Sequence, residues 1–539
     1  MKIFRFTNLI AYLIQGMTLL FFCYLPYQLF SEKTEFGAPF LTHYTIKEYG
    51  GSAQVWNAVQ DRRGLMYFGN GSGVLEFDGK QWQKIPVSNN SLVSALASDS
   101  QGRLFVGAVN EFGYLKPDKL GQLKYISLSQ QLPEKDRSFL EVFRILCVRD
   151  EVYYITKHKI YKYYQNKLKK IPINGMAFYG FKIKDRIFIP QENIGICELK
   201  NDQLYPLKNT VFSSHIGMIH YTEKEFIISH NDSLYLYNLE TESHKPFKSA
   251  ANDYLYQNLY YCNSRIDENR FAIGTIFGGV LILNNQGKIE QIINEPRGME
   301  GSVYHLFTDQ DKNLWASTNN GIIKIDISFP VQQFTKNQNI KDYTLTNIRF
   351  KNTLYVGAMT GLMYLPPYQI SNNQDNHSFR RIESFQGGCW GLEILNDNLF
   401  ALGDYGLSVI QNQIAREIYK TPRNFTLSTN PKFPNALFAG SDGTLKYIEL
   451  NKTKDFNQIQ VIHEYIYKEI KSNVVSIQSD KEQNLWIGTD NQGIYYIHFT
   501  GNTPYQYIIT HFNNTKELGS LNDCYISNVD NQIFISNRA

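Results

Sequence analysis

One short strand pattern returns along almost the whole chain: a bulky residue, an apolar or small residue, and then Gly, Ser or Thr. Its copies run from Tyr67-Phe68-Gly69 to Phe534-Ile535-Ser536, with a degenerate copy at Phe188-Ile189-Pro190. The mean step between neighbouring copies is roughly 42 residues, which is typical of a four-stranded β-propeller blade. Because one small sheet cannot bury both of its faces, neighbouring copies must stack on each other. The repeat therefore constrains the whole fold.

The first copy shows how each unit divides into strands. Residues 55–59 are expected to form an inner strand, and two further strands and an outer strand follow up to Ile85. Asp61 and Gly64 stand in the first turn, where Asp accepts backbone hydrogen bonds and Gly supplies a positive φ. No stretch after the N-terminal leader shows a sustained helical period. We predict an all-β chain of tandem β-propellers.

The spacing of the copies predicts the domain organisation. Residues 1–34 form a leader, residues 35–335 a complete seven-bladed propeller, and residues 336–539 a second, truncated propeller of about four and a half blades. An open ring would leave strand edges exposed. We therefore expect the segment 40–45 to close the first ring as the outer strand of its last blade.

The N-terminus indicates export. Lys2 and Arg5 precede a mostly apolar stretch from Leu9 to Leu25, and polar residues follow it. This order is typical of a signal peptide, although the length also permits an uncleaved N-terminal anchor. The remainder of the chain is therefore predicted to be periplasmic or otherwise extracytoplasmic, with inner-membrane anchoring as an alternative. Within this chain, only the N-terminal segment is expected to touch a membrane.

Charge and cysteine content exclude several classes of protein. The formal net charge is +4, and the basic residues are scattered, so the chain lacks the footprint of a nucleic-acid-binding protein. The six cysteines include no CxxC pair, and most lie in apolar runs, which indicates buried free thiols. The eleven histidines show no metal-ligand spacing. We predict no metal site and no cofactor.

The best copies share a longer motif: Asp, three or four residues ending in Gly or Asn, a Leu-aromatic-apolar-Gly-Thr strand, and a Gly-apolar step. It occurs at residues 480–489 with Gly493-Ile494, at 309–318 with Gly321-Ile322, and more loosely at 61–69 with Gly73-Val74. This motif resembles the two-component-regulator propeller repeat. The chain as a whole is similar to the sensor halves of bacterial receptors that carry two seven-bladed propellers.

The resemblance implies a function. In that family an immunoglobulin-like triple-Tyr domain, a membrane helix and a histidine kinase or LuxR-type output domain follow the propellers, and this sequence holds none of them. We expect the chain to be the ligand-sensing region of such a receptor, truncated before those parts. It would be non-enzymatic itself and a homodimer within an intact receptor.

Two other functions are possible for such a fold. One is a non-catalytic scaffold that binds proteins or glycans, and the other is a propeller enzyme that acts on glycans. A sialidase-type Asp box would support the enzyme alternative. The sequence has none, because Gln310 and Lys312 stand where that motif needs Asp and Gly. Nothing in the sequence indicates a pair of carboxylates that would act as general acid and general base.

Propellers bind ligands at the mouth of the central channel, where the loops of all blades converge. An Asn- and Tyr-rich rim with a central Trp suits an oligosaccharide or another small polar ligand, because aromatic faces stack and amides supply hydrogen bonds. The opposing interpretation is that these Asn residues serve their own hairpin loops and that Trp56 packs between blades. The predicted ligand-binding residues are Trp56, Asn70, Asn110, Glu111, Arg144, Tyr179, Tyr304, Asn319 and Asn320.

Overall fold

A computed structural model describes residues 37–211, 216–230, 233–329, 331–366, 378–421, 424–453 and 455–538. The predicted leader, residues 1–34, lies outside this range. Contacts divide the described residues into two compact units, 37–334 and 335–538. Within both units the described residues form almost only antiparallel four-stranded sheets, so the predicted all-β class is confirmed.

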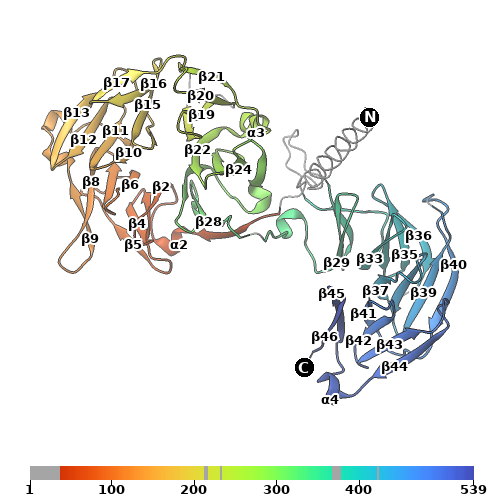
Figure 1. Cartoon of the computed structure of the whole chain (residues 1–539). Coiled ribbons are helices and arrows are strands. Elements are labelled where there is room, and N and C mark those ends of the chain that lie inside the picture. Colours follow the sequence, from red (N-terminus) through yellow and green to blue (C-terminus); the bar gives the residue numbers. More distant parts are fainter. Residues whose placement is uncertain are drawn as a thin grey trace, which may run out of the picture. The chain divides into compact units, whose positions relative to one another are not determined.

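In the first unit the described strands form seven such sheets, arranged around a common centre (Figure 1). The first three sheets are β2 (Val55–Gln60), β3 (Met66–Asn70), β4 (Gly73–Phe77) and β5 (Trp82–Ile85); β6 (Val93–Ser98), β7 (Leu104–Ala108), β8 (Glu111–Pro117) and β9 (Leu123–Ser127); and β10 (Val142–Val148), β11 (Glu151–Thr156), β12 (Lys159–Tyr164) and β13 (Lys167–Pro172). The next three are β14 (Phe181–Ile183), β15 (Arg186–Gln191), β16 (Gly195–Lys200) and β17 (Gln203–Pro206); β18 (Ile216–His220), β19 (Glu225–His230), β20 (Ser233–Asn238) and β21 (Ser243–Pro246); and β22 (Tyr260–Arg265), β23 (Arg270–Thr275), β24 (Val280–Asn284) and β25 (Ile289–Ile293). The degenerate copy at Phe188 thus belongs to a full sheet of its own.

The seventh sheet joins the two ends of the ring. Its strands are β26 (Val303–Thr308), β27 (Leu314–Thr318), β28 (Gly321–Asp326) and, from the N-terminus, β1 (Phe40–Tyr44). β1 pairs antiparallel with β28, from Phe40 opposite Asp326 to Tyr44 opposite Ile322. The expected closure of the first ring by the segment 40–45 is therefore confirmed. It removes an exposed sheet edge.

The second unit continues with the same sheet order in its described residues. Its sheets are β29 (Thr344–Phe350), β30 (Thr353–Ala358), β31 (Gly361–Leu365) and β32 (Arg380–Arg381); β33 (Cys389–Leu395), β34 (Asn398–Gly403), β35 (Gly406–Gln411) and β36 (Ile414–Lys420); β37 (Asn424–Thr429), β38 (Ala436–Ser441), β39 (Thr444–Leu450) and β40 (Val461–Tyr467); β41 (Val474–Ser479), β42 (Leu485–Thr489), β43 (Ile494–Phe499) and β44 (Tyr507–Phe512); and the hairpin β45 (Tyr525–Val529) with β46 (Gln532–Ser536).

Helices are few and short in the described part of the chain. The α-helices are α2 (Ile46–Tyr49), α3 (Ala251–Asn258) and α4 (Thr515–Leu518), and short 3-10 turns lie between some strands. The hydrophobic periodicity did not predict α3, whose Tyr254 and Leu255 are buried. None of the described helices has the length and apolarity needed to cross a bilayer.

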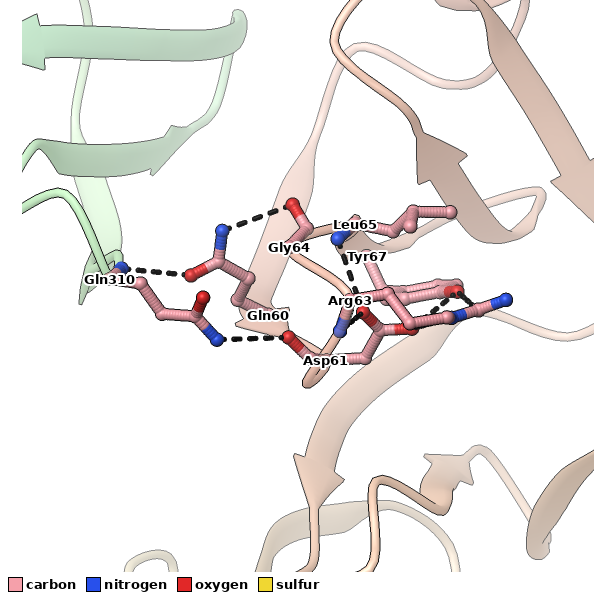
Figure 2. Close-up of polar contacts among 7 residues, drawn as sticks. All are labelled: Gln60, Asp61, Arg63, Gly64, Leu65, Tyr67 and Gln310. Atoms are coloured by element: carbon pink, nitrogen blue, oxygen red, sulfur yellow. Dashed lines mark hydrogen bonds and ion pairs between the residues drawn. The ribbon is translucent and has the colours of Figure 1, made fainter.

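The recurring Asp holds the first turn of its blade. Asp61 Oδ1 accepts hydrogen bonds from the backbone N–H of Arg63 and Leu65, and Oδ2 accepts from the Arg63 guanidinium and the Tyr67 hydroxyl (Figure 2). In the seventh sheet Asp309 Oδ2 accepts instead from the indole N–H of Trp315 at 2.8 Å. The Asp and the aromatic residue six positions later are thus bonded to each other, which explains why both recur in the motif.

Gln310 connects the seventh sheet to the first. Its backbone N–H donates to Gln60 Oε1 at 2.9 Å, and its side-chain amide donates to the Asp61 carbonyl at 3.2 Å (Figure 2). The residue that disqualified this turn as a sialidase-type box therefore has a structural role. It bridges the point at which the ring closes.

Candidate functional site

A ring of bulged residues surrounds one end of the central channel of the first unit. The pairing of an inner strand with its neighbour shifts by one residue between Val55 and Asn57, and the same shift recurs in β6, β10, β22 and β26. A bulge redirects the extra residue away from the regular ladder. We call these five residues the collar: Trp56, Ser94, Phe143, Tyr261 and Tyr304.

Four of the five collar residues are aromatic, and two of them, Trp56 and Tyr261, contact Tyr304. The Trp56 and Tyr304 rings stack with centroids 4.6 Å apart and planes at 9°, and Tyr261 contacts Tyr304 at 5.6 Å. Phe143 packs edge-on against Phe178 at 5.4 Å. Aromatic faces of this kind are the usual platform for apolar faces of polar ring compounds.

The collar also holds a buried donor without an acceptor. Trp56 Nε1 makes no hydrogen bond to any described residue. In the second unit Trp390, at the same bulged position of β33, donates its Nε1–H to Asp404 Oδ1 at 2.6 Å. Buried polar groups normally have partners, so the Trp56 donor is one of the few exceptions in this unit and the one that belongs to the collar.

A cavity of about 430 Å³ lies in the channel behind the collar. Residues from all seven inner strands line it, among them Arg144, Tyr179, His220, Tyr260 and His305. This volume lies within the usual range for small-molecule sites.

The ionisation of the cavity wall follows from burial. Burial lowers the pKa of His305 well below its usual value, and the Arg144 charge acts in the same direction. His305 is therefore neutral near pH 7, and its Nδ1 accepts a hydrogen bond from the Ala58 N–H at 3.2 Å. A neutral imidazole that accepts at Nδ1 carries its proton on Nε2. Burial likewise raises the pKa of Tyr179, so its hydroxyl stays protonated.

The structure brings four of the nine predicted ligand-binding residues to the channel. Trp56 and Tyr304 belong to the collar, and Arg144 and Tyr179 line the cavity. Sequence reasoning missed Phe143, Tyr261 and His305. The signal for the first two was available, because each follows the first residue of an inner strand, as Trp56 follows Val55.

The other predicted residues are already engaged in their own loops. Asn70 bonds the backbone of Ser52 and Gln54, and Asn110 Oδ1 accepts from the N–H groups of Phe139 and Leu140. These amides hold loops, which is the alternative that the sequence left open. Ligand contact by either residue stays a prediction.

Glu111 and Asn319 show the same pattern, whereas Asn320 bonds Thr318 Oγ1 only through its backbone N–H. Glu111 is buried, and its Oε1 accepts from the hydroxyls of Tyr125, Ser127 and Ser129. Asn319 and Asn320 are exposed, and Asn319 Oδ1 accepts from the Ser302 N–H. Their predicted contact with ligand is likewise untested, and the proposal below does not rest on them.

Metal chemistry finds no support among the residues described. In that part of the chain no group of three or more His, Cys, Asp or Glu side chains lies close enough to hold a metal ion. The five described cysteines are free thiols, and four of them are buried.

Similarity to known proteins agrees with the motif. Residues 469–491, which include the Asp480 turn and all of β42, match the family model described as Two component regulator propeller. The extracellular domain of BT3049 from B. thetaiotaomicron, assigned to a hybrid two component system, superimposes with a TM-score of 0.63 at 15% identity. That match covers 93% of this chain and 70% of the other.

Two further structures resemble the chain less well. The extracellular domain of BT4673 from B. thetaiotaomicron, also assigned to a hybrid two component system, has a TM-score of 0.44 at 16% identity and covers 93% of this chain and 70% of its own. Streptogramin B lyase has a TM-score of 0.42 at 12% identity and covers 54% of this chain and 98% of its own. Neither score supports an argument about function. No curated protein matches the sequence.

The fold and the repeated Asp-aromatic turn define a tandem β-propeller protein. Within it, residues 469–491 match the two component regulator propeller repeat, as the motif at Asp480 predicts.

Proposed function

We propose that this chain is the extracytoplasmic ligand-sensing region of a bacterial two-component-type receptor, and that the ligand binds at the collar of the first propeller. The observation that carries the proposal is the Trp56–Tyr304 stack with its unpartnered indole N–H. Stacked aromatic faces beside an unused donor suit a polar ring compound such as an oligosaccharide. The same proposal places the chain outside the cytoplasm and makes the intact receptor a homodimer. The resemblance to the family supports both statements.

Binding rather than catalysis is favoured by the composition of the cavity wall. Its described lining includes no Asp or Glu. Most glycosidases need a pair of carboxyl groups on either side of the scissile bond. The wall instead presents hydroxyl groups, imidazoles and cations.

The test is a thermal-shift screen of the purified protein against a panel of neutral and acidic oligosaccharides. We expect at least one oligosaccharide to raise the melting temperature of the wild type, and Trp56→Ala to abolish that shift. Trp390→Ala is the matched control, because Trp390 occupies the same bulged position in the second unit and has its own acceptor. A shift that survives Trp56→Ala but is lost with Trp390→Ala would refute binding at the collar.

A further inference from the structure

The charged side chains that line the cavity behind the collar are all cations. The formally charged side chains among its lining residues are Arg144, Lys182 and Arg265, and no carboxylate accompanies them. Two neutral imidazoles, His220 and His305, also line the cavity. Cations gathered in a concave, partly desolvated site raise the local concentration of anions.

Arg144 is the central cation of this group. It is half-buried on β10, and within the described residues no carboxylate pairs with it. Four other arginines of this unit do have carboxylate partners at 2.6–2.8 Å; the pairs are Arg63–Asp61, Arg103–Asp99, Arg186–Glu198 and Arg270–Asp267. A partly buried charge without a counter-charge is costly, which makes the lack of a partner for Arg144 informative.

The other two cations are bonded to carbonyl oxygens, and the nearby Asp267 carboxylate, which is not a lining residue, also acts on Arg265. Lys182 Nζ donates to the Cys147 carbonyl at 2.8 Å, and the Arg265 guanidinium donates to the carbonyls of His220 and Glu268. Carbonyl oxygens satisfy donors but carry no net charge. The lining residues therefore supply no negative charge that would offset Arg144.

Neutral donors stand beside the cations. His305 carries a proton on Nε2, because Nδ1 accepts from Ala58, and no described residue accepts from Nε2. His220 Nε2 is buried and has no hydrogen-bond partner among the described side chains and backbone. The Arg144 charge acts on His305, so an oxygen-rich group bound by Arg144 would also lie near the His305 Nε2–H.

We propose that this cavity binds an oxyanion group, a carboxylate, sulfate or phosphate, with the Arg144 guanidinium as its principal partner and the His305 Nε2–H as a second donor. Planar guanidinium groups bind such oxyanions through paired, charge-assisted hydrogen bonds. The inference deepens the proposed function and rests on it, because it makes the sensed ligand an acidic rather than a neutral compound.

The experiment uses the purified full chain and isothermal titration at constant ionic strength. The probes are sodium D-glucuronate against D-glucose, and sodium sulfate against sodium chloride. We expect glucuronate or sulfate to bind the wild type, and the neutral sugar and chloride to bind less tightly. Arg144→Gln should weaken the oxyanion by about tenfold or more, because a charge-assisted contact is lost.

Arg149→Gln is the matched control. Arg149 lies just after β10, its side chain is 78% exposed, and it pairs with Asp185 at 3.2 Å, so its loss should leave oxyanion binding unchanged. If sulfate binds as tightly as glucuronate, the site takes the free anion; if only glucuronate binds, it takes an acidic sugar. Equal oxyanion affinity in the wild type and Arg144→Gln, or no oxyanion binding at all, would overturn the inference.

The two proposals fail in different ways. A neutral oligosaccharide whose binding depends on Trp56, together with no oxyanion binding, would leave the collar proposal intact and remove the anion site. Circular dichroism of Arg144→Gln against the wild type shows that the variant is folded. Arg144→Lys keeps the charge and should retain part of the affinity.

Discussion

The indole of Trp56 lies flat on the ring of Tyr304, with centroids 4.6 Å apart and planes 9° apart. The two residues come from the first and last blades of the ring, on β2 and β26. Because these strands become neighbours only when β1 has closed the ring, the collar and the closure of the propeller are linked.

The indole N–H of Trp56 can be tested apart from its ring. Trp56→Phe keeps an aromatic face for stacking but removes the donor. We expect the affinity for the ligand found by the screen to fall by roughly five- to tenfold, the size of one lost hydrogen bond. Titration calorimetry of both proteins measures the change. An unchanged affinity would show that the N–H takes no part in binding.

Because β1 closes the ring, a substitution that removes its contacts with the first blade should destabilise the first unit. The Tyr44 ring on β1 contacts Phe77, Trp82 and Trp315, with centroids 5.0–5.9 Å away, and so joins the last blade to the first. Tyr44→Ala should lower the free energy of unfolding of the first unit by roughly 2–4 kcal/mol. His43→Ala, exposed on the same strand, should change it by less than about 0.5 kcal/mol. Urea unfolding gives both values, and similar losses in the two variants would contradict this role of β1.

The Asp of the motif is predicted to be structural. Asp309 is buried and accepts from the Asn313 N–H and the Trp315 Nε1–H, both at 2.8 Å. Asp309→Ala leaves these donors unpaired and should cost roughly 2–4 kcal/mol. Asp311→Ala, in the same turn but exposed, is the control. Normal stability of Asp309→Ala in a denaturant titration would exclude this explanation of the repeated Asp.

The second unit should lose stability as the pH rises from acid towards neutrality. Burial raises the pKa of Glu393, on the inner strand β33, to about 7 from an ordinary value of 4.5. The folded state therefore holds a proton that the unfolded chain releases, and stability falls between about pH 4.5 and 7. The loss is roughly 1–3 kcal/mol.

Glu393→Gln should flatten this dependence, and the exposed Glu383→Gln should leave it in place. Thermal unfolding of the second unit at pH 5 and pH 8 measures both variants. An equally steep loss in the wild type and Glu393→Gln would contradict this role of Glu393.

The sequence predicted the sheets better than the site, for a physical reason. Each strand and its Asp turn depend on residues close together in the sequence. The strands β2 to β5, and even the degenerate β15, could therefore be predicted from the spacing of the repeated pattern. The closing strand β1 could also be predicted, because a ring needs its last edge covered.

Hydrogen-bond partners across blades are not local. An Asn in a hairpin has the same sequence signature whether it binds a ligand or, like Asn70, holds the Ser52 loop. The lack of a carboxylate beside Arg144 is likewise visible only when all seven inner strands are in place. Of the predicted rim, the aromatic residues and Arg144 therefore lie in the collar or the cavity wall, whereas amides such as Asn70 and Asn110 are bonded within loops.

A crystal structure of the protein with the oligosaccharide that stabilises it most would test the account most directly. We predict electron density for a sugar ring against the Trp56–Tyr304 pair, with an oxygen about 3 Å from Trp56 Nε1. Density at another place on the protein, with the collar empty at saturating ligand, would contradict the proposed function.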